Sequence, residues 1–244
     1  QVLAPIALYP DELLAPVLMA ATYPEEIEEA YSWVSLHKEL KGQSLKTELA
    51  SKDWDNSVKA LAFVPEILED MLKNAGQTER LSDAVLAQKD DVMKIIQHLR
   101  LRAEYRGNLT STVQQVVEAQ KNDGHEIIVI RSAAPNTIYV PHYDVSAVYG
   151  PGRASPAYGV TFSPGITAPS DVWKDGIDWK SRDIKTGIKT DLMLMDLFDS
   201  DADIRESGQK WQHGATRRCE APYTAKGATK RAAKGLEMLD RKSV

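Results

Sequence analysis

The sequence has few of the features that mark a disulfide framework, a membrane span or a metal site. Cys219 is the one cysteine among 244 residues, which excludes an internal disulfide network. No apolar run approaches the roughly 18 to 20 residues that cross a bilayer, and the stretch at residues 13–21 is short and contains proline. The five histidines form no H-x-x-x-H or H-E-x-x-H pair. We therefore expect no metal ion, no other cofactor and no catalytic residues of a recognisable type.

The composition is that of an ordinary globular protein, with 43% hydrophobic and 27% charged residues. The net charge of −5 conceals an uneven distribution. Residues 205–244 hold ten Lys or Arg and four Asp or Glu, a net charge of +6, so the rest of the chain carries −11. Opposite charge in two parts of a chain indicates that they meet each other, or that the tail of one copy meets the body of the next.

Helical periodicity dominates the first part of the chain. Apolar residues at helical spacing predict helices over residues 13–21, 27–34 and 44–50, a fourth within residues 54–74, and a further stretch that ends near Arg106. We expect Ser44 to cap the third helix and Asp55 or Ser57 the fourth. Pro65 should kink or split the fourth helix, and Gly107–Asn108 is a suitable stop for the last one. Short connections between one-sided helices indicate a compact antiparallel bundle.

The motif tyrosine–proline–acid occurs twice, each time directly before an apolar run. A residue before proline favours extended geometry, proline is tolerated in the first turn of a helix, and the acids that follow face the positive end of the helix dipole. We interpret both copies as helix starts whose tyrosines pack at corners of the fold. The residues concerned are Tyr9, Pro10, Asp11, Tyr23 and Pro24.

The pattern changes after residue 120. Residues 126–132 and 136–144 are rich in β-branched and aromatic residues, and the turn-forming sequence between them predicts that they pair as a hairpin. Gly, Pro and Ser with spaced aromatic residues then indicate loops with short strands, followed by a polar, basic tail that contains one helical pattern near residues 227–239. Residues 190–198 form a short apolar segment of uncertain type.

These observations predict an α+β protein in four segments. A helical bundle (1–120) is followed by a β-hairpin packed on it (121–149), a loop-rich extension with short strands (150–204) and a basic tail (205–244). The tail contains the residues that we expect to mediate assembly, and nucleic acid is an unlikely partner because the chain as a whole is acidic. The assembly candidates are Arg217, Arg218, Lys226, Lys230, Arg231 and Lys234.

Three other patterns partly match catalytic or metal-binding motifs. His142 and Asp144 stand two apart and could form a histidine–carboxylate pair, although no nucleophile accompanies them. Residues 199–210 resemble a calcium loop, but Ile204 and Lys210 stand where glycine and glutamate are needed. Cys219 follows two arginines that could lower its pKa, yet no partner base is evident.

Several phrases, among them LAPIALYPDELLAPVLMAATYP, KDWDNSVKALAFVPEILEDM and TIYVPHYDVSAVYG, resemble the domain-of-unknown-function family 3300. This is a family of bacterial envelope proteins, many of them described as lipoproteins. The resemblance covers nearly the whole chain and implies export in a Gram-negative-type bacterium. It implies no enzyme activity, cofactor or catalytic residue. The family usually has glycine where Cys219 stands.

We therefore expect an exported protein that is periplasmic, outer-membrane-associated or extracellular, and that binds other proteins, including copies of itself. Because the chain begins at Gln1 and not at methionine, we expect a processed start. Membrane association would then require a lipid anchor or export signal that this chain does not contain. The alternatives are an enzyme that processes envelope polymers, with acids and His142 in a cleft, and a small-ligand or glycan binder that uses the aromatic residues from Tyr158 to Trp179.

Overall fold

The computed structural model describes residues 2–122, 124–150, 159–187 and 208–214. These residues form two compact units. The first contains residues 3–15, most of 89–187 and 208–211, and the second contains residues 16–88 and 212–214. The α+β class expected from the sequence is confirmed. The residues of the predicted tail that were assigned to assembly, and Cys219, lie outside the described residues.

Helices build the second unit. After the helix α1 (Asp11–Ala20), whose C-terminal half belongs here, come α2 (Pro24–Leu36), α3 (Gly42–Ala50), α4 (Asn56–Leu61), α5 (Pro65–Lys73) and α6 (Ala75–Ala87). Helix α2 packs against α4 and α5, and α5 packs against α6. Apolar residues at helical spacing, such as Ile27, Ala30 and Val34 on α2, supply the buried faces.

Local signals set the boundaries of these helices. Pro24 and Pro65 each stand in the first turn of a helix, so Pro65 splits the predicted fourth helix into α4 and α5. Asp55 caps α4 through a hydrogen bond from the backbone N–H of Ser57 to its side chain, as predicted. The prediction for α3 was wrong, because Lys41 occupies the N-cap position. Ser44 lies one turn inside the helix, where its hydroxyl bonds back to the N–H and carbonyl of Lys41.

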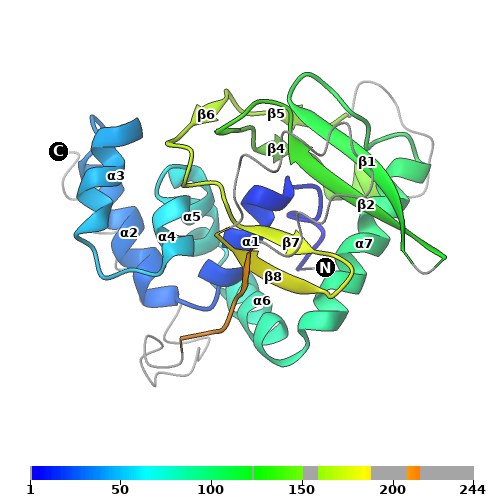
Figure 1. Ribbon diagram of the computed structural model, residues 1–244, viewed down its shortest axis with the longest axis horizontal. Helices are drawn as coiled ribbons and strands as arrows, with labels where there is room; N and C mark the ends of the chain where they lie inside the picture. The colour runs from blue at the N-terminus through cyan, green and yellow to red at the C-terminus, as the bar shows by residue number, and fades with distance from the viewer. Residues whose placement is uncertain (1, 123, 151–158, 188–207, 215–244) are drawn as a thin grey trace. The chain divides into compact units, whose positions relative to one another are not determined.

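The first unit combines one long helix with small antiparallel sheets. Helix α7 (Lys89–Tyr105) ends at Gly107, which has a φ of +74° and, with Asn108, closes the helix by bonds to Glu104 and Ala103. Strands β1 (Gln115–Asn122) and β2 (His125–Ser132) form a long hairpin, and β2 lies against α7 (Figure 1). The remaining elements are β3 (Thr137–Ile138), β4 (Pro141–His142), α8 (Val145–Tyr149), β5 (Thr161–Phe162), β6 (Ile166–Thr167), β7 (Gly176–Asp178), β8 (Asp183–Thr186) and β9 (Gln209–Lys210).

The predicted pairing of residues 126–132 with 136–144 was wrong. Strand β2 pairs with β1, which precedes it, and Asn122 lies opposite His125, so two residues connect the strands. The second of them, Gly124, has a φ of +80°. An Asp-Gly pair is the favoured connection in a two-residue hairpin, and it competes successfully with the longer turn at residues 133–136. Residues 137–142 pair instead with later strands, β3 with β6 and β4 with β5.

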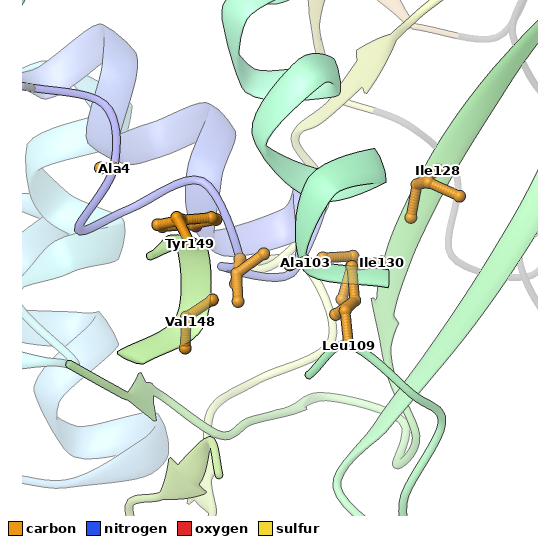
Figure 2. Close-up of a cluster of buried hydrophobic side chains, with 8 residues drawn as sticks. Ala4, Ala103, Leu109, Ile128, Ile130, Val148 and Tyr149 are labelled. Atoms are coloured by element: carbon orange, nitrogen blue, oxygen red, sulfur yellow. The ribbon is translucent and has the colours of Figure 1, made fainter. Parts of the chain in front are cut away.

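A hydrophobic cluster joins the start of the chain to α7, β2 and α8 within the first unit (Figure 2). Leu8, Ile128, Ile130 and Val148 are completely buried in it. Leu8 is separated from Ile128 by 120 positions in the sequence, so this core forms only when distant segments come together. The same convergence brings together the polar side chains around Arg100.

Candidate functional site

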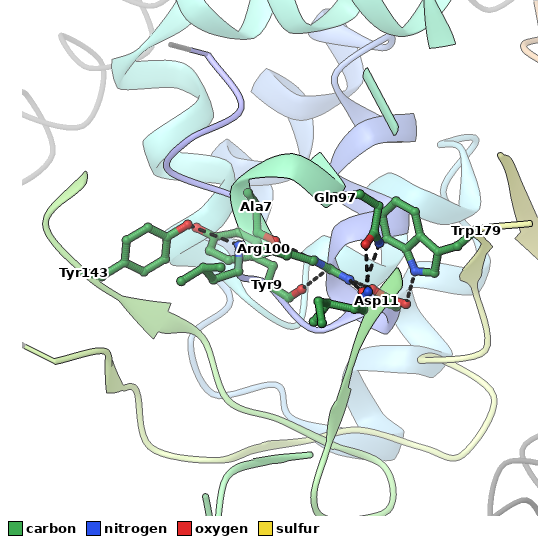
Figure 3. Close-up of polar contacts among 9 residues, drawn as sticks. Ala7, Tyr9, Asp11, Gln97, Arg100, Tyr143 and Trp179 are labelled. Atoms are coloured by element: carbon green, nitrogen blue, oxygen red, sulfur yellow. Dashed lines mark hydrogen bonds and ion pairs between the residues drawn. The ribbon is translucent and has the colours of Figure 1, made fainter. Parts of the chain in front are cut away.

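Arg100 is the centre of a buried polar network in the first unit (Figure 3). It lies on the inner face of α7 and is 0% exposed. Its Nε donates to the carbonyl of Ala7 at 2.8 Å, and its Nη2 donates to the carbonyl of Tyr9 at 2.9 Å. Its Nη1 donates to the carbonyl of Ile128 at 3.0 Å. A single guanidinium thus holds the segment before α1 and the strand β2 against α7.

Asp11 supplies the charge that balances this guanidinium. Its Oδ1 lies 2.7 Å from Nη1 of Arg100, and its Oδ2 accepts a hydrogen bond from the indole Nε1 of Trp179 at 2.7 Å. The Trp179 ring lies 4.8 Å from the guanidinium carbon, so it also makes a cation–π contact. Burial raises the pKa of Asp11, against the opposing effects of Arg100 and the Trp179 hydrogen bond. Trp179 therefore attaches the β7–β8 hairpin to the network.

Glu12 lies beside Asp11 in the first turn of α1 and is 7% exposed. Burial, and to a smaller extent the charge of Asp11, raises the pKa of its carboxyl from 4.5 to about 7. Backbone N–H groups and Arg131 act in the opposite direction. Glu12 is thus a carboxyl that exchanges its proton near neutral pH, a property that its position in the sequence does not reveal.

Side chains also cover the outer edge of β2. The amide of Gln97 donates to the carbonyl of Ile128 at 2.9 Å and accepts from its N–H at 2.8 Å, as a neighbouring strand would. On the other strand, the hydroxyl of Ser111 bonds both backbone groups of Val117. These contacts occupy positions at which an exposed strand could pair with another chain.

Tyr143 anchors the first residues of the chain. Its hydroxyl donates to the carbonyl of Ala4 at 2.8 Å and accepts from the N–H of Leu8 at 3.3 Å. Burial raises the pKa of Tyr143 well above its ordinary value and that of the neighbouring Tyr149 to about 12. Both tyrosine hydroxyls therefore remain neutral in the physiological pH range, and neither acts as a base.

In the second unit, Tyr23 receives a segment from far along the chain. The His213 ring stacks on Tyr23 with 5.1 Å between ring centroids, and the N–H of Gly214 donates to the tyrosine hydroxyl at 3.1 Å. Thr22 donates its own hydroxyl proton to the carbonyl of Met19, so its oxygen serves as the acceptor for Nδ1 of His213 at 3.2 Å. Two residues of the basic tail, His213 and Gly214, are thereby fixed on the helical unit.

A second aromatic cluster joins α2 to the residues before α4. Trp33 stacks on His37 and meets Trp54 edge to face, and Nζ of Lys52 lies 4.7 Å from the centroid of Trp33. Glu29 accepts from the indole of Trp54 at 3.1 Å. These rings and charges contact one another, and the cluster ties α2 to the segment between α3 and α4.

The predicted helix starts are confirmed, but the structure adds contacts that the pattern did not predict. Tyr9 and Asp11 belong to the Arg100 network, and Tyr23 belongs to the His213 contact. Sequence reasoning missed Arg100 itself. It could have been noticed because Val92, Ile96 and Ala103 place position 100 on the buried face of α7, where an arginine needs a partner.

The patterns proposed for catalysis or ligand binding have other contacts. Asp144 accepts the N–H of Ala147 and caps α8, while the His142 side chain is exposed. Trp173 and Trp179 of the aromatic region are buried, so their faces do not form an open platform for a sugar. The candidate calcium loop falls on residues outside those described, apart from its last three positions. In the described ranges, no group of three or more His, Cys, Asp or Glu side chains is arranged to hold a metal ion.

The network around Arg100 is built to hold chain segments together. Its guanidinium is enclosed and directed at three carbonyls and one carboxylate, so an anionic substrate would have to displace protein groups. The geometry therefore favours a structural role for this site.

None of the helices in the described part of the chain has the length and apolar character needed to cross a membrane.

The family described as "Protein of unknown function (DUF3300)" matches residues 1–213. Among curated proteins, the uncharacterized protein YacH of Escherichia coli (strain K12) is 33% identical over 192 residues. That match includes 67% of this chain but 31% of YacH, so the chain spans less than a third of this relative's length. No solved structure matches the chain.

Proposed function

The chain belongs to the DUF3300 family, and we propose that it is a non-enzymatic protein of the bacterial envelope or extracellular space that works by binding proteins, including copies of itself. The observation that carries the proposal is the separation of charge, −11 over residues 1–204 against +6 over residues 205–244. Electrostatic complementarity of this kind steers association and fixes which surfaces meet.

The chemistry of the described residues supports a binding role. Two buried charged groups of the first unit, Arg100 and Asp11, contact each other, and their remaining bonds go to backbone carbonyls and the Trp179 indole. Acids in the first turn of α2, Glu25 and Glu26, keep part of their surface accessible. Gly214, which precedes Arg217 by three positions, donates its N–H to Tyr23, directly before that acidic turn. This contact supports the proposal, because it attaches part of the basic segment close in sequence to acidic residues.

The test is the oligomeric state of the full chain at low and high salt, measured by sedimentation velocity. We expect assembly at about 50 mM salt and dissociation at about 500 mM, because screening weakens contacts between exposed charges. In a tail variant, the six assembly candidates are replaced by glutamine, and this variant should be monomeric in both conditions.

A matched control removes six exposed cations from the body of the protein and so changes the net charge by the same amount. The residues replaced in the control are Lys38, Lys41, Arg80, Arg102, Lys121 and Lys180. The control should still assemble. A wild-type protein that is monomeric in both salt conditions would contradict self-assembly, and equal loss in both variants would show that net charge alone matters.

The proposed location has its own experiment. Fractionation of cells that express the complete gene product should place it in the periplasm, the outer membrane or the medium. Recovery in the cytoplasm alone would contradict an envelope role.

A further inference from the structure

Glu12 is a buried carboxyl with an incomplete set of partners. It is the second residue of α1 and is 7% exposed. Its own backbone N–H and that of Ser132, at the end of β2, donate to the carboxyl. Its Oε2 has no hydrogen-bond partner among the residues that the structure describes. A buried ionised carboxylate would leave this oxygen uncompensated, whereas a protonated carboxyl is neutral.

The cations around Glu12 serve other carboxylates. Arg100, on α7, lies 2.7 Å from Asp11, the neighbour of Glu12 on α1. Arg131, on β2, acts on Glu12 but also lies 3.9 Å from Glu118 on β1. The enclosed volume thus holds two adjacent carboxyls and one fully buried guanidinium. A proton on this pair of carboxyls falls on Glu12, because Asp11 is paired with Arg100 while Arg131 is shared between Glu12 and Glu118.

We propose that Glu12 is a proton-controlled latch of the first unit. While its carboxyl is protonated, the first turn of α1 packs on the end of β2 beside Ser132. Loss of the proton places a second, buried negative charge next to Asp11, and this cost outweighs the stronger hydrogen bonds that the carboxylate accepts from the backbone, so the turn loosens. The charged groups that face the latch are Asp11 on α1, Arg131 on β2 and, through Asp11, Arg100 on α7. The latch gives the protein a stability that responds to ambient pH.

The direction of the response follows from linkage. Burial raises the pKa of Glu12 from 4.5 to about 7 in the folded protein. The stabilising effect of the proton is therefore complete below pH 4.5 and is lost as the pH rises to about 7. Each pKa unit is tenfold in the unfolding equilibrium constant, so the difference between 4.5 and about 7 corresponds to a change of roughly 300-fold.

The experiment compares urea unfolding of the wild-type full chain and of Glu12→Gln between pH 4.5 and 8. Glutamine has the same shape as the protonated carboxyl and cannot ionise. The ratio of their unfolding constants should change by about 150-fold across this range, in favour of the variant at high pH, because the unfolded carboxyl is already half ionised at pH 4.5. Glu25→Gln is the matched control, since Glu25 is the second residue of α2 and is only half-buried. Its ratio to wild type should change far less.

A local readout identifies the element that moves. Hydrogen exchange of the Ser132 amide, corrected for the intrinsic pH dependence of exchange, should accelerate above pH 7 in the wild type but not in Glu12→Gln. A pH-independent ratio of unfolding constants would overturn the proposal. If Glu12→Gln does not fold, carbon NMR of the wild-type Glu12 carboxyl decides: titration near pH 7 supports the latch, and titration near pH 4.5 overturns it.

Discussion

The replacement Arg100→Met should destabilise the protein more than most single substitutions would. Methionine is apolar and of similar length, so the change removes the charge and the donors while much of the side-chain volume stays. Three buried carbonyls, those of Ala7, Tyr9 and Ile128, lose their donor from the guanidinium. Each unsatisfied buried group costs about 1 to 3 kcal/mol, less where another donor remains, as Gln97 does for Ile128.

Loss of the ion pair with Asp11 lowers the free energy of unfolding of Arg100→Met further. Without Arg100, a carboxylate that is 6% exposed retains the Trp179 indole as a partner but no adjacent cation. Removal of one member of a buried ion pair costs about 3 to 5 kcal/mol. Because these effects overlap, we expect a total of at least about 4 kcal/mol in the free energy of unfolding at pH 7. That is a large part of the roughly 5 to 15 kcal/mol of a typical domain.

A double-mutant cycle separates the charge from the other contacts. Asp11→Asn alone should cost about 3 kcal/mol or more, because it leaves a buried guanidinium uncompensated. The double variant Arg100→Met with Asp11→Asn should be less destabilised than the sum of the two single variants, because no unpaired charge remains. Arg100→Lys keeps the charge, but an ammonium cannot reproduce the forked geometry of the four contacts.

The assay is equilibrium urea unfolding followed by far-ultraviolet circular dichroism and by tryptophan fluorescence, with full reversibility checked. A shift in the midpoint at constant slope measures the change in stability. A cost below about 1 kcal/mol for Arg100→Met, or strictly additive effects in the cycle, would refute the view that this buried network holds the first unit together.

Two further predictions concern other contacts. Tyr23→Phe keeps the ring that stacks on His213 but removes the acceptor for the N–H of Gly214. Hydrogen exchange of the Gly214 amide should accelerate about fivefold, as expected for the loss of about 1 kcal/mol. Unchanged exchange would contradict the contact. Burial raises the pKa of Asp183, but hydrogen bonds from Lys89 and Lys210 prevail and hold it below 3.8. Its stabilising effect is therefore present above that pH and lost as the pH falls further. Asp183→Asn should accordingly lower the urea midpoint at pH 7 and converge with the wild type in acid, whereas a constant difference down to pH 2 would be the contrary result.

Local sequence was sufficient for much of the secondary structure. Pro24 and Pro65 begin helices, Asp55 caps one and Gly107 ends another, because each acts through the backbone within one turn of its own position. The same locality explains the error at the hairpin. Two turn signals compete for residues 126–132, and the tighter connection at Gly124 selects β1 as the partner.

The network could not be derived in the same way. Asp11 in a first turn is explained equally well by the helix dipole, and nothing adjacent in the sequence points to Arg100 or to Trp179, which is 168 positions away. The pKa of Glu12 depends on burial and on Asp11 and Arg131, of which only Asp11 is its neighbour in the chain.

The sequence by itself determined the family, the helix starts and stops and the uneven distribution of charge, since these depend on residues read in order. Only the tertiary structure decided that Tyr9 and Asp11 contact Arg100, that Tyr23 receives His213, and that Glu12 lies without a cation of its own. The physical reason is burial. Removal from water turns an ordinary charge into one that must find a partner, and the fold alone sets which partners are within reach.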